Sequence, residues 1–272
     1  MTITFTRNQG TSPLLISIPH DGRRIPPRIA ERMTEAALEL PDTDWYVRKL
    51  YDFAAISGAT VIAAKYSRYF IDLNRSPEDE ALYEGKRSTG LCPLQTFAGD
   101  RIYVEGREVT AKGKQRRVEK YWRPYHAEIA EALARIREQF GYALLWDAHS
   151  IRGEVPALFE GELPDLNIGT NGGRSCPKTV EDAVSAVAAA SRYSYVVNGR
   201  FIGGFITRHY GDPERGVFAV QLELAQRTYM TESTRRYDGQ RAAALRSTLS
   251  DMLAAFQESA ASFIAETNAG QK

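Results

Sequence analysis

The chain reads Tyr142-Ala143-Leu144-Leu145-Trp146-Asp147-Ala148-His149 at a point where an apolar run ends in a histidine. Such a run is typical of a strand that is covered on both faces, as in a parallel sheet. A similar run, Leu14-Leu15-Ile16-Ser17-Ile18-Pro19-His20, also ends in a histidine. In open α/β sheets, ligands bind beyond the carboxyl ends of the strands. The two runs therefore predict an α/β sheet whose functional site includes His20 and His149.

Strand-like and helix-like segments alternate along the rest of the chain. Further strands are expected at 60–64, 69–73, 166–169, 193–197, 205–207 and 217–224. Helices are expected after Pro26-Pro27, over 44–57, over 110–139 with a kink near Pro124, over 179–190 and within 232–266. This alternation predicts the α/β class, as an α/β/α sandwich with a mostly parallel mixed sheet. Because no repeat, linker or change in composition interrupts it, residues 1–272 are expected to form a single domain, with a long loop over 76–100.

The composition narrows the class of protein. The 272 residues include 35 Lys and Arg against 34 Asp and Glu, which is a formal net charge of +1. This balance favours neither nucleic acid nor a membrane surface as a partner. The N-terminal residues lack a signal-peptide pattern, no apolar run has the length of a membrane span, and Cys92 and Cys176 form no paired motif. We therefore expect a cytoplasmic protein and leave its oligomeric state open.

His20 and His149 are candidate ligands of a catalytic metal, because two histidines and one carboxylate are a common zinc set in hydrolases. Asp44, in Asp42-Thr43-Asp44-Trp45 at the expected start of a helix, can supply the carboxylate. Asp147 can hydrogen-bond to the ring of a histidine ligand and so fix its orientation. Structural interpretations compete with these: the histidines can cap strand ends, and Asp44 can stabilise the helix dipole without any metal.

Three further groups of polar residues lie on strands or at their ends. Glu223 lies in the apolar run 217–224, where it is either a general base next to a metal-bound water or part of a polar strand face. Asn74-Arg75 can clamp a substrate carboxylate, the alternative being a surface ion pair. Arg208-His209 can hold a carboxylate or a developing oxyanion, the alternative being an ordinary turn.

Taken in order, these segments resemble the N-formylglutamate amidohydrolase family. The resemblance runs from about residue 11 to residue 230, so it covers most of the chain, and the ordered set of motifs is specific. The motifs are Ser17-Ile18-Pro19-His20-Asp21-Gly22, Thr43-Asp44-Trp45-Tyr46-Val47, Phe70-Ile71-Asp72-Leu73-Asn74-Arg75, Tyr121-Trp122-Arg123-Pro124-Tyr125-His126, Asp147-Ala148-His149-Ser150, Asn167-Ile168-Gly169-Thr170, Gly203-Gly204-Phe205-Ile206-Thr207-Arg208-His209-Tyr210-Gly211 and Gln221-Leu222-Glu223-Leu224.

The family resemblance implies a phosphorylase/hydrolase-like α/β/α fold, similar to that of zinc carboxypeptidases and aspartoacylase. It implies the hydrolysis of N-formyl-L-glutamate to formate and L-glutamate, a step of histidine degradation. It also implies that His20 and His149 are zinc ligands, that Asn74-Arg75 is the carboxylate clamp, and that Glu223 activates water.

The chain departs from the carboxypeptidase spacing His-x-x-Glu, because position 23 is Arg23. The acidic ligand must therefore come from elsewhere, and we expect Asp44, with Asp21 as the alternative. Zn²⁺, or another divalent metal such as Co²⁺, would lower the pKa of its bound water and polarise the formyl oxygen. Glu223 would take the proton of that water and return it to the leaving nitrogen. Two other functions stay open, a hydrolase of another N-acyl amino acid and a metal-free module that binds a dicarboxylate.

Overall fold

A mixed β-sheet forms the centre of the protein. The computed structural model describes residues 4–80 and 89–270, and within these residues the sheet has seven strands. In spatial order they are β1 (Phe5–Asn8), β3 (Thr60–Ala64), β2 (Leu14–Ile18), β4 (Ala143–Ile151), β7 (Val217–Ala225), β5 (Leu166–Gly169) and β6 (Tyr195–Val197). β3, β2, β4 and β7 are mutually parallel, β1 and β5 run antiparallel to β3 and β7, and β6 is parallel to β5. The predicted mostly parallel mixed sheet is confirmed.

The carboxyl ends of β2, β4 and β7 lie side by side at one edge of the sheet. In the pairing of β2 with β4, Ser17 lies opposite Asp147, and His20 follows the end of β2 by two residues. In the pairing of β4 with β7, His149 lies opposite Glu223. The fold thus brings two histidines and a glutamate to the edge where α/β proteins bind their ligands.

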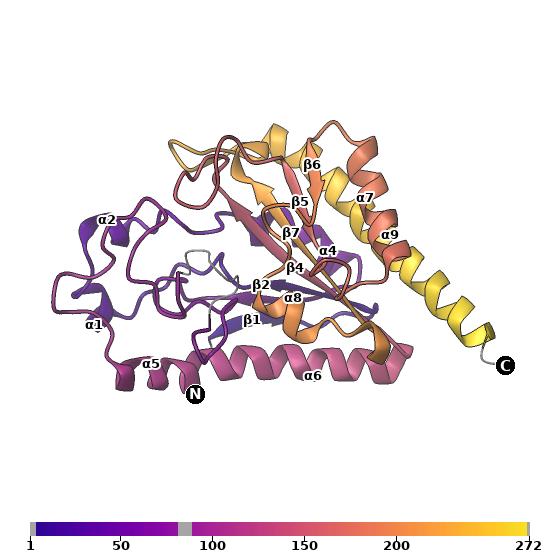
Figure 1. Ribbon diagram of the computed structural model, residues 1–272, viewed down its shortest axis with the longest axis horizontal. Helices are drawn as coiled ribbons and strands as arrows, with labels where there is room; N and C mark the ends of the chain where they lie inside the picture. The colour runs from indigo at the N-terminus through magenta and orange to yellow at the C-terminus, as the bar shows by residue number, and fades with distance from the viewer. Residues whose placement is uncertain (1–3, 81–88, 271–272) are drawn as a thin grey trace.

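Helices cover both faces of the sheet, because successive residues of each buried strand point to opposite sides. Leu14 and Ile16 of β2 pack in the core cluster that includes residues of α7 (Lys178–Ala190) and α9 (Gly239–Gly270). Leu15 packs in the opposite cluster, which includes residues of α6 (Arg123–Phe140). Figure 1 shows α6 along one side of the sheet and the paired α7 and α9 along the other.

Most of the helices are short, and three are long. Their bounds are α1 (Pro27–Ala30), α2 (Glu35–Leu38), α3 (Val47–Leu50), α4 (Asp52–Ile56), α5 (Ala111–Arg117), α6 (Arg123–Phe140), α7 (Lys178–Ala190), α8 (Phe205–Tyr210) and α9 (Gly239–Gly270). A π-helical turn, Val118–Trp122, joins α5 to α6, whose second residue is Pro124. Short 3₁₀ turns lie at Pro213–Arg215 and Gln226–Thr228, and the strands β8 (Met230–Thr231) and β9 (Arg236–Tyr237) form a separate pair. Among the described residues, no helix is both long enough and apolar enough to cross a membrane.

Two of the predicted strands are wrong. The segment 69–73 is a buried turn in which the backbone N–H of Phe70 donates to the Ser67 carbonyl at 2.9 Å. Its apolar character reflects burial against the helical layers and not pairing within the sheet. The segment 205–207 is the first turn of α8, whose Ile206 is fully buried. Short apolar runs of this kind fit a strand and a buried helical turn equally well, so periodicity does not separate them.

Other boundaries also differ from the sequence prediction. The helix expected over 44–57 is divided into α3 and α4, and it begins late because Tyr46 adopts a left-handed conformation with φ 64°. The region 232–266 starts with a turn and β9, and α9 then continues to residue 270. The edge strand β1 was not predicted. The described parts of the loop 76–100 contain no named helix or strand, and residues 81–88 lie outside the described residues.

Candidate metal centre and active site

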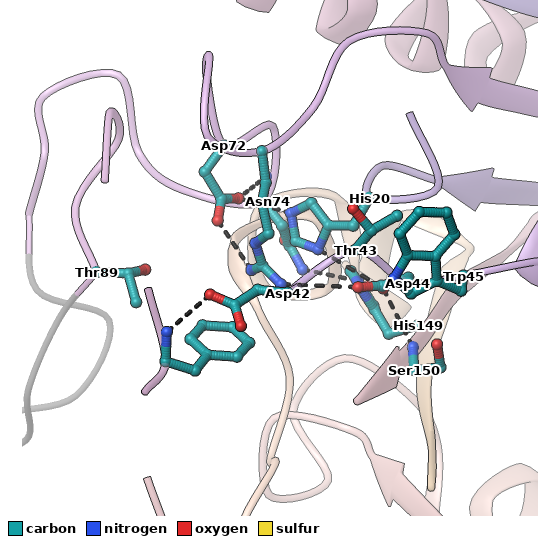
Figure 2. Close-up of polar contacts among 12 residues, drawn as sticks. His20, Asp42, Thr43, Asp44, Trp45, Asp72, Asn74, Thr89, His149 and Ser150 are labelled. Atoms are coloured by element: carbon teal, nitrogen blue, oxygen red, sulfur yellow. Dashed lines mark hydrogen bonds and ion pairs between the residues drawn. The ribbon is translucent and has the colours of Figure 1, made fainter. Parts of the chain in front are cut away.

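Three residues expected as metal ligands lie together at the carboxyl edge of the sheet (Figure 2). One potential ligand atom of each of His20, Asp44 and His149 lies within 4.8 Å of the others, and all three side chains are buried. His20 follows β2, and its carbonyl accepts a hydrogen bond from the Asp44 backbone N–H at 3.2 Å. His149 is held within β4. Asp21, the alternative acidic ligand, is not part of this cluster among the described residues.

The outer nitrogen of each histidine ring faces a second buried carboxylate. His20 Nε2 lies 2.7 Å from Asp72 Oδ1, and His149 Nε2 lies 3.1 Å from Asp147 Oδ2. The Nδ1 atoms therefore face inward, at 3.7 Å and 3.0 Å from Asp44 Oδ2. Carboxylates in this outer position fix the tautomer and orientation of metal-binding histidines. The structure thus places Asp147 where the sequence analysis expected a residue that orients a ligand ring.

The unsatisfied polar atoms of the cluster test whether it fits a metal. His20 Nδ1 and Asp44 Oδ1 are buried and have no hydrogen-bond partner within the described residues. Burying such atoms without a hydrogen bond is destabilising, whereas a bound cation would satisfy both. Two imidazole nitrogens and one carboxylate also form the donor set of many catalytic zinc sites. The residues present therefore fit a divalent metal ion.

A buried arginine, not expected from the sequence, balances the acidic groups. Arg68 Nη2 donates to Asp72 Oδ2 at 3.0 Å, and Arg68 Nη1 lies 3.6 Å from Asp44 Oδ1. Burial acts to raise the pKa of Asp72, but His20 and Arg68 outweigh it and hold the pKa well below its usual range. Burial likewise opposes the ionisation of Asp44, yet a hydrogen bond from His149 and the nearby cations lower its pKa. Both carboxylates are therefore ionised at neutral pH.

The two histidines differ in their protonation in the absence of a bound ion. Burial, followed by the charge of Arg68, lowers the pKa of His20. Burial acts in the same direction on His149, but Asp147 and Asp44 outweigh it and raise its pKa well above the usual value. A metal ligand needs an unprotonated nitrogen, so a metal that binds here must displace the proton of His149.

Glu223 lies on β7 beside this cluster, in register with His149. Within the described residues, the Glu223 carboxylate forms no hydrogen bond, and the residue is only 8% exposed. Burial raises the pKa of Glu223 to about 8, although the charge of His149 acts to lower it. A carboxyl group in such surroundings can both accept and donate a proton near neutral pH.

The residues expected to bind substrate surround the cluster at different depths. Asn74 is 3% exposed, and its Nδ2 lies 2.9 Å from His149 Nε2. Its Oδ1 accepts a hydrogen bond from the Ile206 backbone N–H at 2.8 Å. Arg75 is half-buried, and its Nη2 donates to Thr89 Oγ1 at 3.3 Å. The structure therefore brings Asn74 onto the metal cluster and leaves Arg75 at its margin.

The second pair of expected substrate residues lies on α8. Arg208 is half-buried, and its Nε donates to the Gly203 carbonyl at 2.8 Å. His209 is more exposed and stacks on Phe205, with the ring centroids 4.8 Å apart. Burial lowers the pKa of His209. The helix α8 thus presents one partly buried cation and one accessible imidazole.

The roles of Arg68 and Asp72 were not expected from the sequence. The spacing of four residues between them was a usable signal, because an arginine and an aspartate so spaced can pair when the chain turns. No signal in the sequence showed that Arg68 would be buried, since arginine is seldom inside a protein unless it is paired.

A buried set of two histidines and a carboxylate, next to a glutamate of raised pKa, is the arrangement of a metal-dependent hydrolase. The sequence profile of the N-formylglutamate amidohydrolase family matches residues 12–230, and the chain belongs to this family. The family predicted from the ordered motifs is therefore confirmed.

Individual relatives agree with this assignment. The chain is 52% identical to an N-formylglutamate deformylase from Pseudomonas putida over 227 residues, which are 83% of this chain and 85% of that protein. It is 54% identical to an N-formylglutamate deformylase from Pseudomonas aeruginosa over 225 residues, 82% of this chain and 84% of that protein. The fold is similar to the crystal structure of an N-formylglutamate amidohydrolase from Ralstonia eutropha JMP134, with a TM-score of 0.81 at 23% identity, covering 94% of this chain and 97% of that chain.

Proposed function

We propose that this protein hydrolyses N-formyl-L-glutamate to formate and L-glutamate, with a divalent metal held by His20, Asp44 and His149. The observation that carries the proposal is the buried cluster of these three residues in a member of the N-formylglutamate amidohydrolase family. The names of the two Pseudomonas relatives agree with this substrate. Because L-glutamate and formate are released, the reaction fits a step of histidine degradation.

The donor set supports Zn²⁺ as the metal, and Co²⁺ suits the same ligands. When bound, such an ion polarises the formyl oxygen and lowers the pKa of a bound water. Asp72 and Asp147 hold the outer ring nitrogens, so the inner nitrogen of each histidine stays directed at the centre of the site.

Glu223 is the proposed general base and acid. Its carboxylate accepts a proton from the attacking water and then donates that proton to the amide nitrogen that leaves. Its position opposite His149, its burial and its raised pKa support this role. In the holoenzyme, the nearby positive charge would lower the pKa of Glu223 and favour the basic form before the reaction begins.

Arg75 and Arg208 are the proposed contacts for the two carboxylates of the substrate. Guanidinium groups bind carboxylates through paired, charge-assisted hydrogen bonds. Asn74 completes this side of the site, because its amide oxygen accepts from Ile206 and so ties the turn that carries Arg75 to the helix that carries Arg208. His209 is proposed as a second contact for the carboxylate or the oxyanion.

The decisive experiment measures formate released from N-formyl-L-glutamate by the purified protein, before and after chelation and with Zn²⁺ or Co²⁺ added back. We expect release that is lost on chelation and restored by metal. Parallel assays with N-acetyl-L-glutamate and with formyl derivatives of neutral amino acids define the substrate. Turnover of those compounds alone would replace the proposed substrate, and release that survives complete metal removal would contradict the proposed metal.

Two matched variants test the ligand assignment. Asp44→Asn removes the carboxylate of the cluster, whereas Asp21→Asn removes a neighbouring buried carboxylate outside it. We expect Asp44→Asn to lose bound metal and turnover together, and Asp21→Asn to keep the metal. The reverse result would make Asp21 the acidic ligand.

A further inference from the structure

A cavity that lies apart from the proposed metal centre is lined by positively charged side chains. It has a volume of about 420 Å³ and is lined by residues of α1, α5 and the π-helical turn, at the end of the molecule where Figure 1 shows α1 above α5. Within the described residues, no acidic side chain lines it, and none of the residues assigned to the metal, the water or the substrate does so. Six of its lining residues are cations: Arg28, Arg32, Lys112, Arg116, Arg117 and Lys120.

Within the described residues, these six cations have no carboxylate partner. Across the described residues, none of them forms an ion pair with an acidic side chain. Arg32 donates instead to the backbone carbonyls of Arg107 and Glu108, and Arg117, which is 4% exposed, donates to the Phe70 carbonyl at 2.6 Å. Neutral acceptors of this kind fix the position of a guanidinium group but do not balance its charge. In a chain whose net charge is only +1, these six cations are a local excess of positive charge.

The cations on the helical side of the cavity are spaced so that they repel one another. Lys112 and Arg116 are four residues apart in α5, and Lys120 follows four residues later in the π-helical turn. Like charges at this spacing are neighbours on a helix and destabilise it. The adjacent Glu119 does not relieve the repulsion, because its carboxylate pairs with Arg123 at 3.0 Å. A bound anion would supply the missing counter-charge.

We propose that this cavity binds a small phosphorylated molecule. Arginine and lysine N–H groups form strong charge-assisted hydrogen bonds with phosphate oxygens, and several of them converge here. The volume lies in the range of small-molecule sites, and a concave site favours a small ligand over the backbone of a nucleic acid duplex. Pro26, Ile29 and Tyr121 supply an apolar wall beside the cations, which suits the organic part of a phosphomonoester.

Calorimetric titration of the metal-loaded, full-length protein with AMP tests the proposal, with adenosine as the uncharged comparison. We expect AMP to saturate one site with a dissociation constant on the order of 0.1 mM, and adenosine not to bind. The affinity for AMP should fall as salt is raised, because exposed charges are screened.

Charge-reversal variants locate the site. Arg116→Glu should weaken AMP binding by at least about tenfold, and Lys120→Glu should act in the same direction. Arg137→Glu is the matched control, since Arg137 is an exposed arginine near the end of α6 that does not line the cavity, and it should bind AMP as the wild type does. All three variants should keep formate release, because they lie outside the proposed catalytic site.

Four results would overturn the proposal. The first is no saturation by AMP up to about 10 mM, and the second is equal affinity for AMP and adenosine. The third is unchanged AMP affinity in both Arg116→Glu and Lys120→Glu, which would place the bound AMP elsewhere. Binding of duplex DNA or of anionic vesicles without any binding of AMP would also reject the small-molecule site, and would assign the charge to a macromolecular surface.

Discussion

Replacing Glu223 by glutamine should change how the stability of the metal-free protein depends on pH. Burial raises the pKa of Glu223 from an ordinary value of 4.5 to about 8 in the folded protein. Between these two values the folded chain keeps a proton that the unfolded chain releases. Stability from this group is therefore present below pH 4.5 and is lost as the pH rises through about 8. Glutamine carries no such proton, so Glu223→Gln should lose this part of the pH dependence.

The size of the effect follows from the shift in pKa. A shift of about 3.5 units corresponds to about 5 kcal/mol over the whole window, at about 1.4 kcal/mol for each unit. Between about pH 5 and pH 8, roughly 3 kcal/mol of this is lost, because titration is incomplete at both limits. The wild type should therefore lose roughly 3 kcal/mol more than Glu223→Gln over this interval.

Urea unfolding of the two chelated proteins at several pH values, followed by tryptophan fluorescence, measures the difference directly. Addition of Zn²⁺ is the internal control, because a nearby cation favours the ionised form of Glu223 and should shrink the difference. Parallel stability curves for wild type and variant in the absence of metal would show that Glu223 titrates normally, and the argument for a general base of raised pKa would fail.

Four further predictions concern the site and the core. Asp72→Asn should weaken metal binding by about 10- to 100-fold, measured by competition with a chromophoric chelator, because it removes the carboxylate that holds the His20 ring; unchanged affinity would contradict this role. Arg75→Ala should raise KM for N-formyl-L-glutamate by about 10- to 100-fold with a smaller change in kcat in steady-state assays, whereas an effect on kcat alone would exclude it as a simple binding residue. Metal affinity should fall as pH falls, because the pKa of His149 is raised and protons compete with the metal; pH-independent affinity between about pH 6 and 8 would be inconsistent with this. Trp146→Ala should lower the free energy of unfolding, measured in the same urea titrations, by about 3–5 kcal/mol because Trp146 is fully buried. The control Ile56→Ala, at a side chain 90% exposed, should change it by less than about 0.5 kcal/mol.

The sheet was predictable because its central strands are covered on both faces and therefore appear as continuous apolar runs. This holds for β2 and for most of β4, whose residues are all buried. The same rule failed at 69–73, where an apolar run is buried in a turn, and at 205–207, where it begins a short helix. In both segments, tertiary packing decides the backbone conformation, and the local pattern carries no information about it.

The candidate site was predictable to the extent that its residues lie on predictable elements. His20, His149 and Glu223 each lie on or just beyond a central strand, so the parallel topology alone brings them to one edge. Arg68 lies in a turn, and its burial between Asp44 and Asp72 depends on how that turn packs against distant segments. Sequence spacing gives no access to that packing.

The π-helical turn between α5 and α6 sets the rotational phase of one helix relative to the other. The apolar face of α6, including Tyr125 and Ile129, is fixed by its packing on the sheet. Deleting the exposed Lys120 would shorten the turn by one residue and rotate α5 by about 100° relative to α6. Arg117 would then point away from the Phe70 carbonyl. The extra residue of the π-helical turn thus sets the direction in which the side chains of α5 point. Without it, α5 would expose a different set of side chains.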